Sequence, residues 1–243
     1  MHIEPRSQTR FKPALLTIDD GPSPDMRLKV DFVAGLGIQA LWFCTGRALE
    51  ARPDDAIYAI RRGQVIGNHS YRHRRYSGLT LSQGQQDISR ADELIDSIYA
   101  AAGEPRPGQF FRFPFGDKGD ARRKDFQRLL ADSGYQCPRQ LKTAWNGPDG
   151  YLLSREVDWG WTFDTKDWAL GRPQPVPGLE TIDKLFARMD ADDPKAGLGL
   201  NRDGAEVVLI HDHVSTTKHF PVLIQRLLTM GLVFLPVVGQ SPD

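Results

Sequence analysis

The stretch Thr17-Ile18-Asp19-Asp20-Gly21-Pro22 places two adjacent carboxylates directly after the apolar run at residues 14–16. An apolar run of this kind is typical of a buried strand, and the Gly-Pro pair that follows forces the backbone to turn. Neighbouring side chains at a strand end point in different directions, so one carboxylate can bind a cation while the other stays free to accept a proton. The alternative is that both only cap a helix beginning near residues 24–25, since Asp is a favoured capping residue.

Length and charge limit the classes of protein to which this chain can belong. Its 243 residues suit one α/β domain, and lysine plus arginine equals aspartate plus glutamate at 31 each. No net field therefore draws the chain to nucleic acid or to an anionic membrane, and an uncharged or locally recognised substrate fits better. No stretch approaches the ~20 apolar residues of a membrane span. Residues 1–6 lack the apolar core of a signal peptide, which predicts a cytoplasmic protein as the chain stands, or a secreted or envelope protein if a leader was removed.

Apolar segments alternate with amphipathic ones, which predicts repeated βα units around a mostly parallel sheet or barrel. A capping box at Ser82 and Gln85 indicates the start of one helix, Gly231 follows the end of another, and weaker patterns lie near 25–35, 54–62, 122–132 and 180–190. If the units close into a barrel, catalytic groups should come from the C-terminal ends of strands. The predicted strands are residues 14–18, 40–44, 64–67, 110–112, 135–137, 157–162, 206–211 and 232–237.

A pair of histidines follows the predicted strand at 64–67, and its members, His69 and His73, stand four residues apart. One helical turn would let both imidazoles face one cation, with Ser70 able to stiffen the turn by a hydrogen bond. An isolated pair at this spacing is more often without function, so the metal hypothesis depends on the acid pair. Two histidines and one carboxylate make a three-ligand site that leaves a position open for water, as expected of a catalytic zinc.

Three further stretches end predicted strands: RFPFG at 112–116, DTKDW at 164–168 and LIHD at 209–212. Together with TIDDGP at 17–22 and HSYRH at 69–73, and in the same order, they resemble the five motifs of the polysaccharide deacetylase family. This family, carbohydrate esterase family 4, includes chitin and peptidoglycan deacetylases. The resemblance covers about residues 14–238. It implies that residues 1–243 form a single catalytic domain with a distorted (β/α) barrel fold.

The resemblance also implies roles for four catalytic residues. Asp19 matches the general base and His211 the general acid, while Arg112 matches the residue that orients the base and Asp167 the partner of the acid histidine. A guanidinium beside a carboxylate holds it ionised, and a carboxylate beside a histidine raises its pKa toward the protonated form. Those are the two protonation states that hydrolysis by a base and an acid requires.

The other matched positions concern the metal and the substrate. Trp168 and Leu209 match the residues of a small apolar pocket for an acetyl methyl group, although either could be ordinary core. The backbone N–H of Phe115 matches an oxyanion donor; phenylalanine here and isoleucine at position 18 are modest departures from the family pattern. The matched metal ligands are Asp20, His69 and His73.

The function implied is metal-dependent removal of N-acetyl groups from amino-sugar residues of a glycan, with release of acetate. Zinc is the first choice for the His-His-Asp set, and cobalt, nickel or iron are alternatives. The other hypotheses are an amidase or deformylase acting on a small metabolite, an O-deacetylase, and a non-catalytic glycan-binding relative. No sequence pattern assigns an oligomeric state.

The long interval between Asp167 and His211 is a further candidate feature. Residues 169–205 leave and return near the predicted active-site mouth, so they could form a rim that helps to select the substrate. The alternative is an ordinary βα connection with its usual helix.

Overall fold

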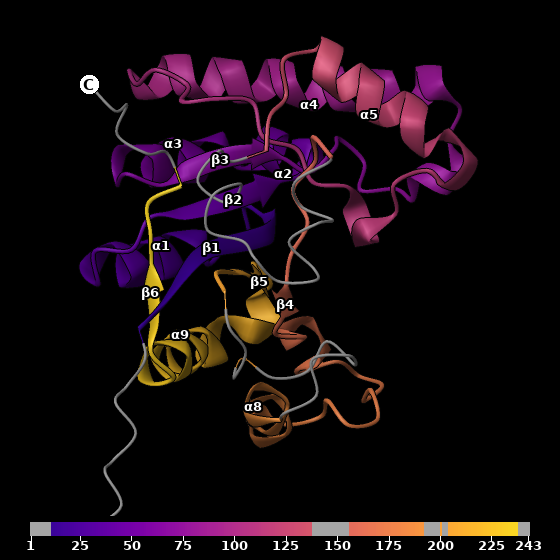
Figure 1. Cartoon of the computed structure of the whole chain (residues 1–243). Coiled ribbons are helices and arrows are strands. Elements are labelled where there is room, and N and C mark those ends of the chain that lie inside the picture. Colours follow the sequence, from indigo (N-terminus) through magenta and orange to yellow (C-terminus); the bar gives the residue numbers. More distant parts are fainter. Residues whose placement is uncertain (1–10, 138–155, 192–199, 201–203, 238–243) are drawn as a thin grey trace, which may run out of the picture.

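The computed structural model describes residues 11–137, 156–191, 200 and 204–237. These residues form a six-stranded sheet whose pairings are all parallel, with helices packed around it (Figure 1). The strand order is β3-β2-β1-β5-β4, and β6 pairs with the start of β1. The strands are β1 (Lys12–Gly21), β2 (Ala40–Cys44), β3 (Val65–Asn68), β4 (Phe163–Asp164), β5 (Glu206–His211) and β6 (Leu232–Phe234).

Helices follow the strands, as the alternation in the sequence predicts. The α-helices are α1 (Met26–Gly35), α2 (Gly46–Ala51), α3 (Pro53–Arg61), α4 (Leu81–Ala102), α5 (Arg123–Asp132), α8 (Ile182–Asp190) and α9 (Phe220–Thr229). Short 3-10 helices include η1 (Tyr76–Gly78), η2 (Pro114–Gly116), η4 (Asp167–Ala169) and η6 (Val214–His219). None of the helices in the described part of the chain is long and apolar enough to cross a membrane.

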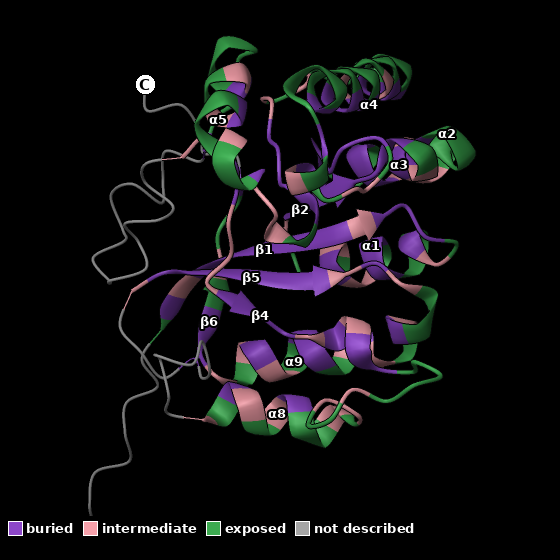
Figure 2. Ribbon diagram, turned by 90° about the vertical axis from the view of Figure 1, so that its right-hand side faces the viewer, coloured by how far each residue is buried: buried purple, intermediate pink, exposed green. Residues whose placement is uncertain are grey.

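Alternate residues of the strands divide between two apolar clusters, as the two-residue period of a strand requires. Leu16, Trp42 and Ile210 belong to the large cluster that the surrounding helices complete. Leu15 and Phe43 belong to a second cluster on the opposite face, which Phe110 and Trp159 help to fill. Both faces are therefore covered, and β1 and β5 are buried along most of their length (Figure 2).

The predicted strands at 110–112, 135–137 and 157–162 are irregular in the structure. The first two take part only in the isolated bridges Asn68↔Phe111 and Gln109↔Tyr135, and no strand occurs among described residues 156–162. Single backbone hydrogen bonds replace ladders there: Trp159 N–H donates to Phe111 O at 2.8 Å, and Thr162 N–H donates to Val207 O at 2.9 Å. Together with the bridge between Asn68 and Phe111, these bonds connect β3 to β5 through irregular segments, and no continuous strand ladder joins β3 to β4 among the described residues. The last strand also ends earlier than predicted, at Phe234.

The capping box of α4 lies two residues before the predicted one. Thr80 Oγ1 accepts from Gln83 N–H at 3.2 Å, and Gln83 Oε1 accepts from Thr80 N–H at 3.0 Å. Thr80 and Gln83 have the same three-residue spacing as Ser82 and Gln85. Because Thr80 comes first in the chain, its side chain caps the free backbone N–H groups at the start of the helix. The long helix and its buried face are as predicted.

Packing between α4 and α5 depends on Gly84. A Cβ at this position would lie 2.3 Å from Phe126 Cε1, in the aromatic cluster that also holds Tyr76 and Phe113. This cluster supports η2, which carries Phe115. Gly84 is thus a packing requirement, although glycine weakens a helix interior.

We expect Gly84→Ala to destabilise the protein by about 1–3 kcal/mol, because the overpacked methyl displaces Phe126. Gly35→Ala is the matched control: nothing lies within 4 Å of its Cβ position, so the gain in helix propensity of up to ~1 kcal/mol is unopposed. Urea unfolding followed by circular dichroism measures both. Equal or higher stability of Gly84→Ala would contradict the packing argument.

Candidate active site

The candidate site lies at the carboxyl ends of the parallel strands. The β1–β5 register places Asp19 opposite His211, and the β2–β3 register ends at Cys44 and Asn68, directly before His69. A cavity of about 1000 Å³ opens at this edge. Eight of the ten predicted site residues line it: Asp19, Asp20, His69, His73, Phe115, Trp168, Leu209 and His211. The other two, Arg112 and Asp167, are fully buried behind the wall.

Asp20, His69 and His73 form a candidate metal group. Their ligand atoms all lie within 4.8 Å of one another, with His73 Nε2 3.1 Å and His69 Nε2 3.5 Å from Asp20 Oδ1. Asp20 Oδ1 is buried and has no hydrogen-bond partner among the described residues. His69 Nδ1 lies 2.8 Å from Arg112 O, and a carbonyl can only accept, so the proton belongs on Nδ1 of the neutral ring. That tautomer turns the lone pair of Nε2 toward Asp20, which suits a cation between them.

Charge in this group shifts two pKa values. Burial alone would raise the pKa of Asp20, but contacts with His213, His69 and His73 hold it well below its usual range. Burial alone would lower the pKa of His69, but the carboxylates of Asp19 and Asp20 raise it. A metal needs the neutral imidazole, so protons compete with the cation at His69.

Backbone geometry between His69 and His73 differs from the predicted helical turn. Ser70 and His73 have φ values of 64° and 52°, so a bend, not a helix, brings the two imidazoles together. The bend forms because Asn68 Oδ1 accepts from Ser70 N–H at 2.8 Å and Ser70 Oγ accepts from His73 N–H at 3.1 Å. The stiffening role predicted for Ser70 fits this bond. Asp20, with φ 73°, does not cap α1, which has no side-chain cap.

Asp19 is held by a buried guanidinium. Arg112 Nη1 donates to Asp19 Oδ1 at 2.7 Å and to Thr17 Oγ1 at 2.8 Å. Its remaining nitrogens donate to Trp159 O at 3.1 Å and Gly160 O at 2.8 Å. The arrangement leaves Asp19 Oδ2 facing the metal group, 3.6 Å from His69 Nε2.

His211 is paired with Asp167 on the other side of the cavity. His211 Nδ1 lies 2.9 Å from Asp167 Oδ1, and His211 N–H donates to Asp167 Oδ2 at 3.1 Å. Thr165 Oγ1 donates to Asp167 Oδ1 at 3.0 Å and helps to fix the carboxylate. Burial alone would lower the pKa of His211, but the charge and hydrogen bond of Asp167 raise it to about 9. The ring is therefore protonated at neutral pH.

The predicted substrate residues differ in exposure. Leu209 is buried, Trp168 is half-buried, and Phe115 is 55% exposed with φ 59°. The Phe115 ring lies 4.5 Å from the ring of His73, and the Arg75 guanidinium lies 4.6 Å from the Phe115 ring. These positions bring an apolar wall and an exposed aromatic ring to the same cavity as the charged groups.

The structure adds a residue that the sequence analysis missed. His213 lines the cavity, and its Nε2 lies 2.8 Å from Asp20 Oδ2. The available signal was a fourth histidine, besides His69, His73 and His211, that stands two residues after His211 in the loop that leaves the same strand end.

Part of the predicted rim also lines the cavity. Gly171, Arg172 and Pro173 are lining residues, and α8 confirms the helix predicted near 180–190. Residues 192–199 and 201–203 lie outside the described residues, so the role of residues 169–205 in selecting substrate stays a prediction.

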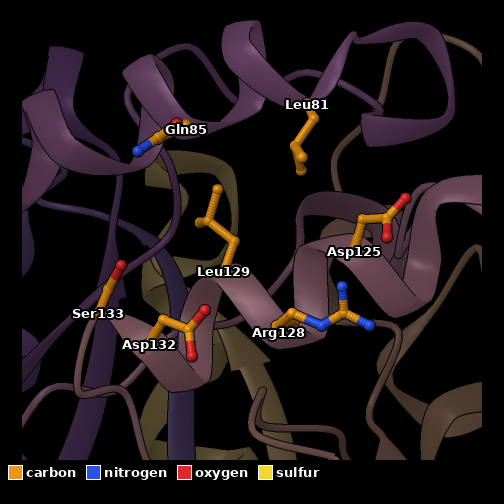
Figure 3. A pocket seen from close by; sticks show the side chains of 7 residues that line it. All are labelled: Leu81, Gln85, Asp125, Arg128, Leu129, Asp132 and Ser133. Carbon is orange, nitrogen blue, oxygen red and sulfur yellow. The ribbon is translucent and has the colours of Figure 1, made fainter.

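A second, smaller hollow of about 300 Å³ lies between α4 and α5. Leu81 and Leu129 point into it from the two helices, and Asp125, Arg128 and Asp132 surround it (Figure 3). None of its lining residues belongs to the predicted site. The predicted site residues therefore gather at the strand ends and not here.

Comparison with known proteins identifies the family of the chain. The family model described as polysaccharide deacetylase matches residues 6–137, more than half of the chain. The chain therefore belongs to the polysaccharide deacetylase family. It is 27% identical over 154 residues to the peptidoglycan-N-acetylglucosamine deacetylase of Bacillus cereus. That alignment covers 63% of this chain but only 45% of the relative's length.

Solved structures share the fold. A family 4 carbohydrate esterase from Streptomyces lividans matches with a TM-score of 0.60 and 21% identity, covering 92% of this chain and 91% of that one. A family 4 pseudoenzyme from Bacillus anthracis matches with a TM-score of 0.62 and 20% identity, covering 94% and 65%. Because a pseudoenzyme has the same fold, catalysis has to be argued from the site residues.

We expect His69→Ala, His73→Ala and Asp20→Ala each to weaken zinc binding by more than ~10–100-fold, which is the loss that typically follows removal of a residue hydrogen-bonded to a metal ligand. Each substitution removes one donor atom of the group. Metal content after dialysis against a mild chelator is the measurement, and His219→Ala, outside the cavity, is the matched control. One equivalent of zinc retained by all three variants would show that the ligand set is wrong.

A second expectation concerns the charge beside His211. Asp167→Asn should lower the pKa of His211 by about 1–3 pH units from its value of about 9, because the opposite charge that favours the imidazolium is lost. NMR titration of the histidine ring signals measures the change. Asp132→Asn, at the second hollow, is the control and should leave the titration where it was; an unaltered or raised pKa in Asp167→Asn would refute the pairing.

Proposed function

We propose that this protein is a metal-dependent hydrolase that removes N-acetyl groups from amino-sugar residues of a glycan of the chitin or peptidoglycan type. The observation that carries the proposal is the placement of two opposed proton-transfer pairs around one metal group. Asp19, backed by Arg112, and His211, backed by Asp167, line the same cavity. The substrates named for relatives in the family support the choice of glycan.

Asp20, His69 and His73 would hold the cation. When bound, it would polarise the amide carbonyl and lower the pKa of a water molecule. Zinc is the first choice for two imidazoles and one carboxylate, and Co²⁺, Ni²⁺ and Fe²⁺ are alternatives.

Asp19 acts as the general base in this proposal. Arg112 occupies Oδ1, so Oδ2 is the oxygen that accepts the proton from the attacking water. The guanidinium also holds the carboxylate in place at a distance of 2.7 Å. As the proton moves to Asp19, the water oxygen forms a bond to the carbonyl carbon.

His211 completes the reaction as the general acid. It begins protonated, with a pKa of about 9, and gives its proton to the amide nitrogen as the C–N bond breaks. The products are acetate and a free amine on the sugar. Activity should therefore fall at alkaline pH, as His211 loses its proton before the reaction.

Trp168 and Leu209 would hold the acetyl methyl group, and the backbone N–H of Phe115 would stabilise the developing oxyanion. The apolar lining that the two side chains bring to a charged cavity supports the first role. Two observations support the role of the Phe115 N–H as an oxyanion donor. Phe115 has a positive φ, and the aromatic contact between Tyr76 and Phe113 packs against the η2 turn that carries it, so its backbone is held in one position.

The test is incubation of the zinc-loaded protein with N-acetylglucosamine oligomers, peptidoglycan fragments, acetylated xylan and small formyl amides. Free amine plus acetate from the first two substrates is the expected result. Asp19→Asn should retain zinc but lose at least ~10²–10⁴-fold of the rate, which is what a general base typically contributes.

The other outcomes identify the alternatives. Acetate from xylan without any amine would indicate an O-deacetylase, and turnover of formyl amides alone would indicate a small-molecule amidase or deformylase. Glycan binding without turnover would contradict the enzymatic proposal and match a non-catalytic relative. Equal rates for Asp19→Asn and the native protein would show that Asp19 is not the general base.

A further inference from the structure

The two oxygens of Asp20 have different environments. Oδ1 is the atom close to His69 and His73, and it has no hydrogen-bond partner among the described residues. Oδ2 lies 2.8 Å from His213 Nε2. One oxygen thus faces the candidate metal group while the other contacts an imidazole from the opposite side.

The direction of this hydrogen bond follows from the chemistry of the two groups. An ionised carboxylate can only accept hydrogen bonds, so His213 Nε2 must carry the proton and donate it to Oδ2. Without such a bond, a carboxylate can rotate and offer a cation either oxygen or both. With Oδ2 engaged, Oδ1 is left as the single oxygen for a cation.

His213 is itself held by a buried network. Asp212 accepts from Ser23 Oγ at 2.7 Å and from Lys29 Nζ at 2.6 Å, and Lys29, also buried, donates to His213 O at 2.9 Å. Thr216 Oγ1 donates to the same carbonyl at 2.9 Å. The backbone of His213 is therefore tied to α1 and to η6, so its ring starts from a well-defined position.

We propose that His213 is a positioning residue for the metal-binding carboxylate: it binds Asp20 Oδ2 and presents Oδ1 alone to the cation. The proposal rests on the metal site of the proposed function but does not require its substrate. Hydrogen-bonded partners of metal ligands generally orient the ligands in this way, and their loss typically costs ~10–100-fold in metal affinity.

The experiment measures zinc affinity of the full chain, without substrate, by competition with a chromophoric chelator. His213→Ala should weaken zinc binding by about 10–100-fold, because Asp20 loses the donor that orients it. His213→Gln keeps an N–H donor of similar reach and should recover most of the affinity. His219→Ala is the matched control and should bind zinc as the native protein does.

The His213 side chain is 37% exposed, so truncation leaves the core intact, and circular dichroism checks that each variant is folded. Native affinity in His213→Ala would overturn the proposal. An equal loss in the alanine and glutamine variants would also overturn it, because it would make His213 a direct ligand. Absence of zinc binding by the native chain would overturn both this proposal and the metal site.

Failure of the proposed function gives a different result. If the chain binds zinc with the expected dependence on His213 but hydrolyses no acylated glycan, the positioning role of His213 stands and only the proposed substrate is wrong. Conversely, if the protein deacetylates glycans and His213→Ala binds zinc with unaltered affinity, the proposed function stands and the positioning role of His213 is refuted.

Discussion

The buried ion pair between Arg112 and Asp19 is the interaction on which the rest of the site depends. Arg112 has no exposed surface, and its guanidinium donates to β1 through Asp19 and Thr17 and to the carbonyls of Trp159 and Gly160. Its backbone N–H donates to Asn68 O, and its carbonyl fixes His69 Nδ1. Breaking a buried pair of this kind typically costs about 3–5 kcal/mol, because the remaining charge has no partner. One residue thus joins Asp19, the candidate metal ligand His69 and the irregular segments between β3 and β5.

Strained backbone is concentrated around the same cavity. Asp20, Ser70, His73 and Phe115 all have positive φ values, which non-glycine residues rarely adopt. Such conformations persist only where surrounding contacts over-determine them, as the hydrogen bonds within 68–73 do. The strain is consistent with a preorganised site, in which the imidazoles and carboxylates meet without rearrangement when a ligand arrives.

Electrostatic asymmetry gives the cavity its proposed chemistry. A guanidinium lies behind Asp19, whereas a carboxylate lies behind His211 and raises its pKa toward the protonated form. These two charged pairs support the proposal of catalysis. The fold alone does not, since a pseudoenzyme shares it.

The sequence by itself determined the family and the parallel α/β class, and eight of the ten site residues that it predicts line one cavity. Motifs at strand ends carry this information because the side-chain types and their order along the chain define the chemistry. Only the tertiary structure decided that 110–112 and 157–162 pair by isolated hydrogen bonds, that His69 and His73 meet through a bend, and that His213 contacts Asp20. Periodicity reports local propensity and burial, whereas the contacts of 110–112, 157–162 and His213 join residues far apart in the chain, and the bend depends on side-chain hydrogen bonds within 68–73. The contact between His213 and Asp20 forms only once β1 and β5 lie side by side.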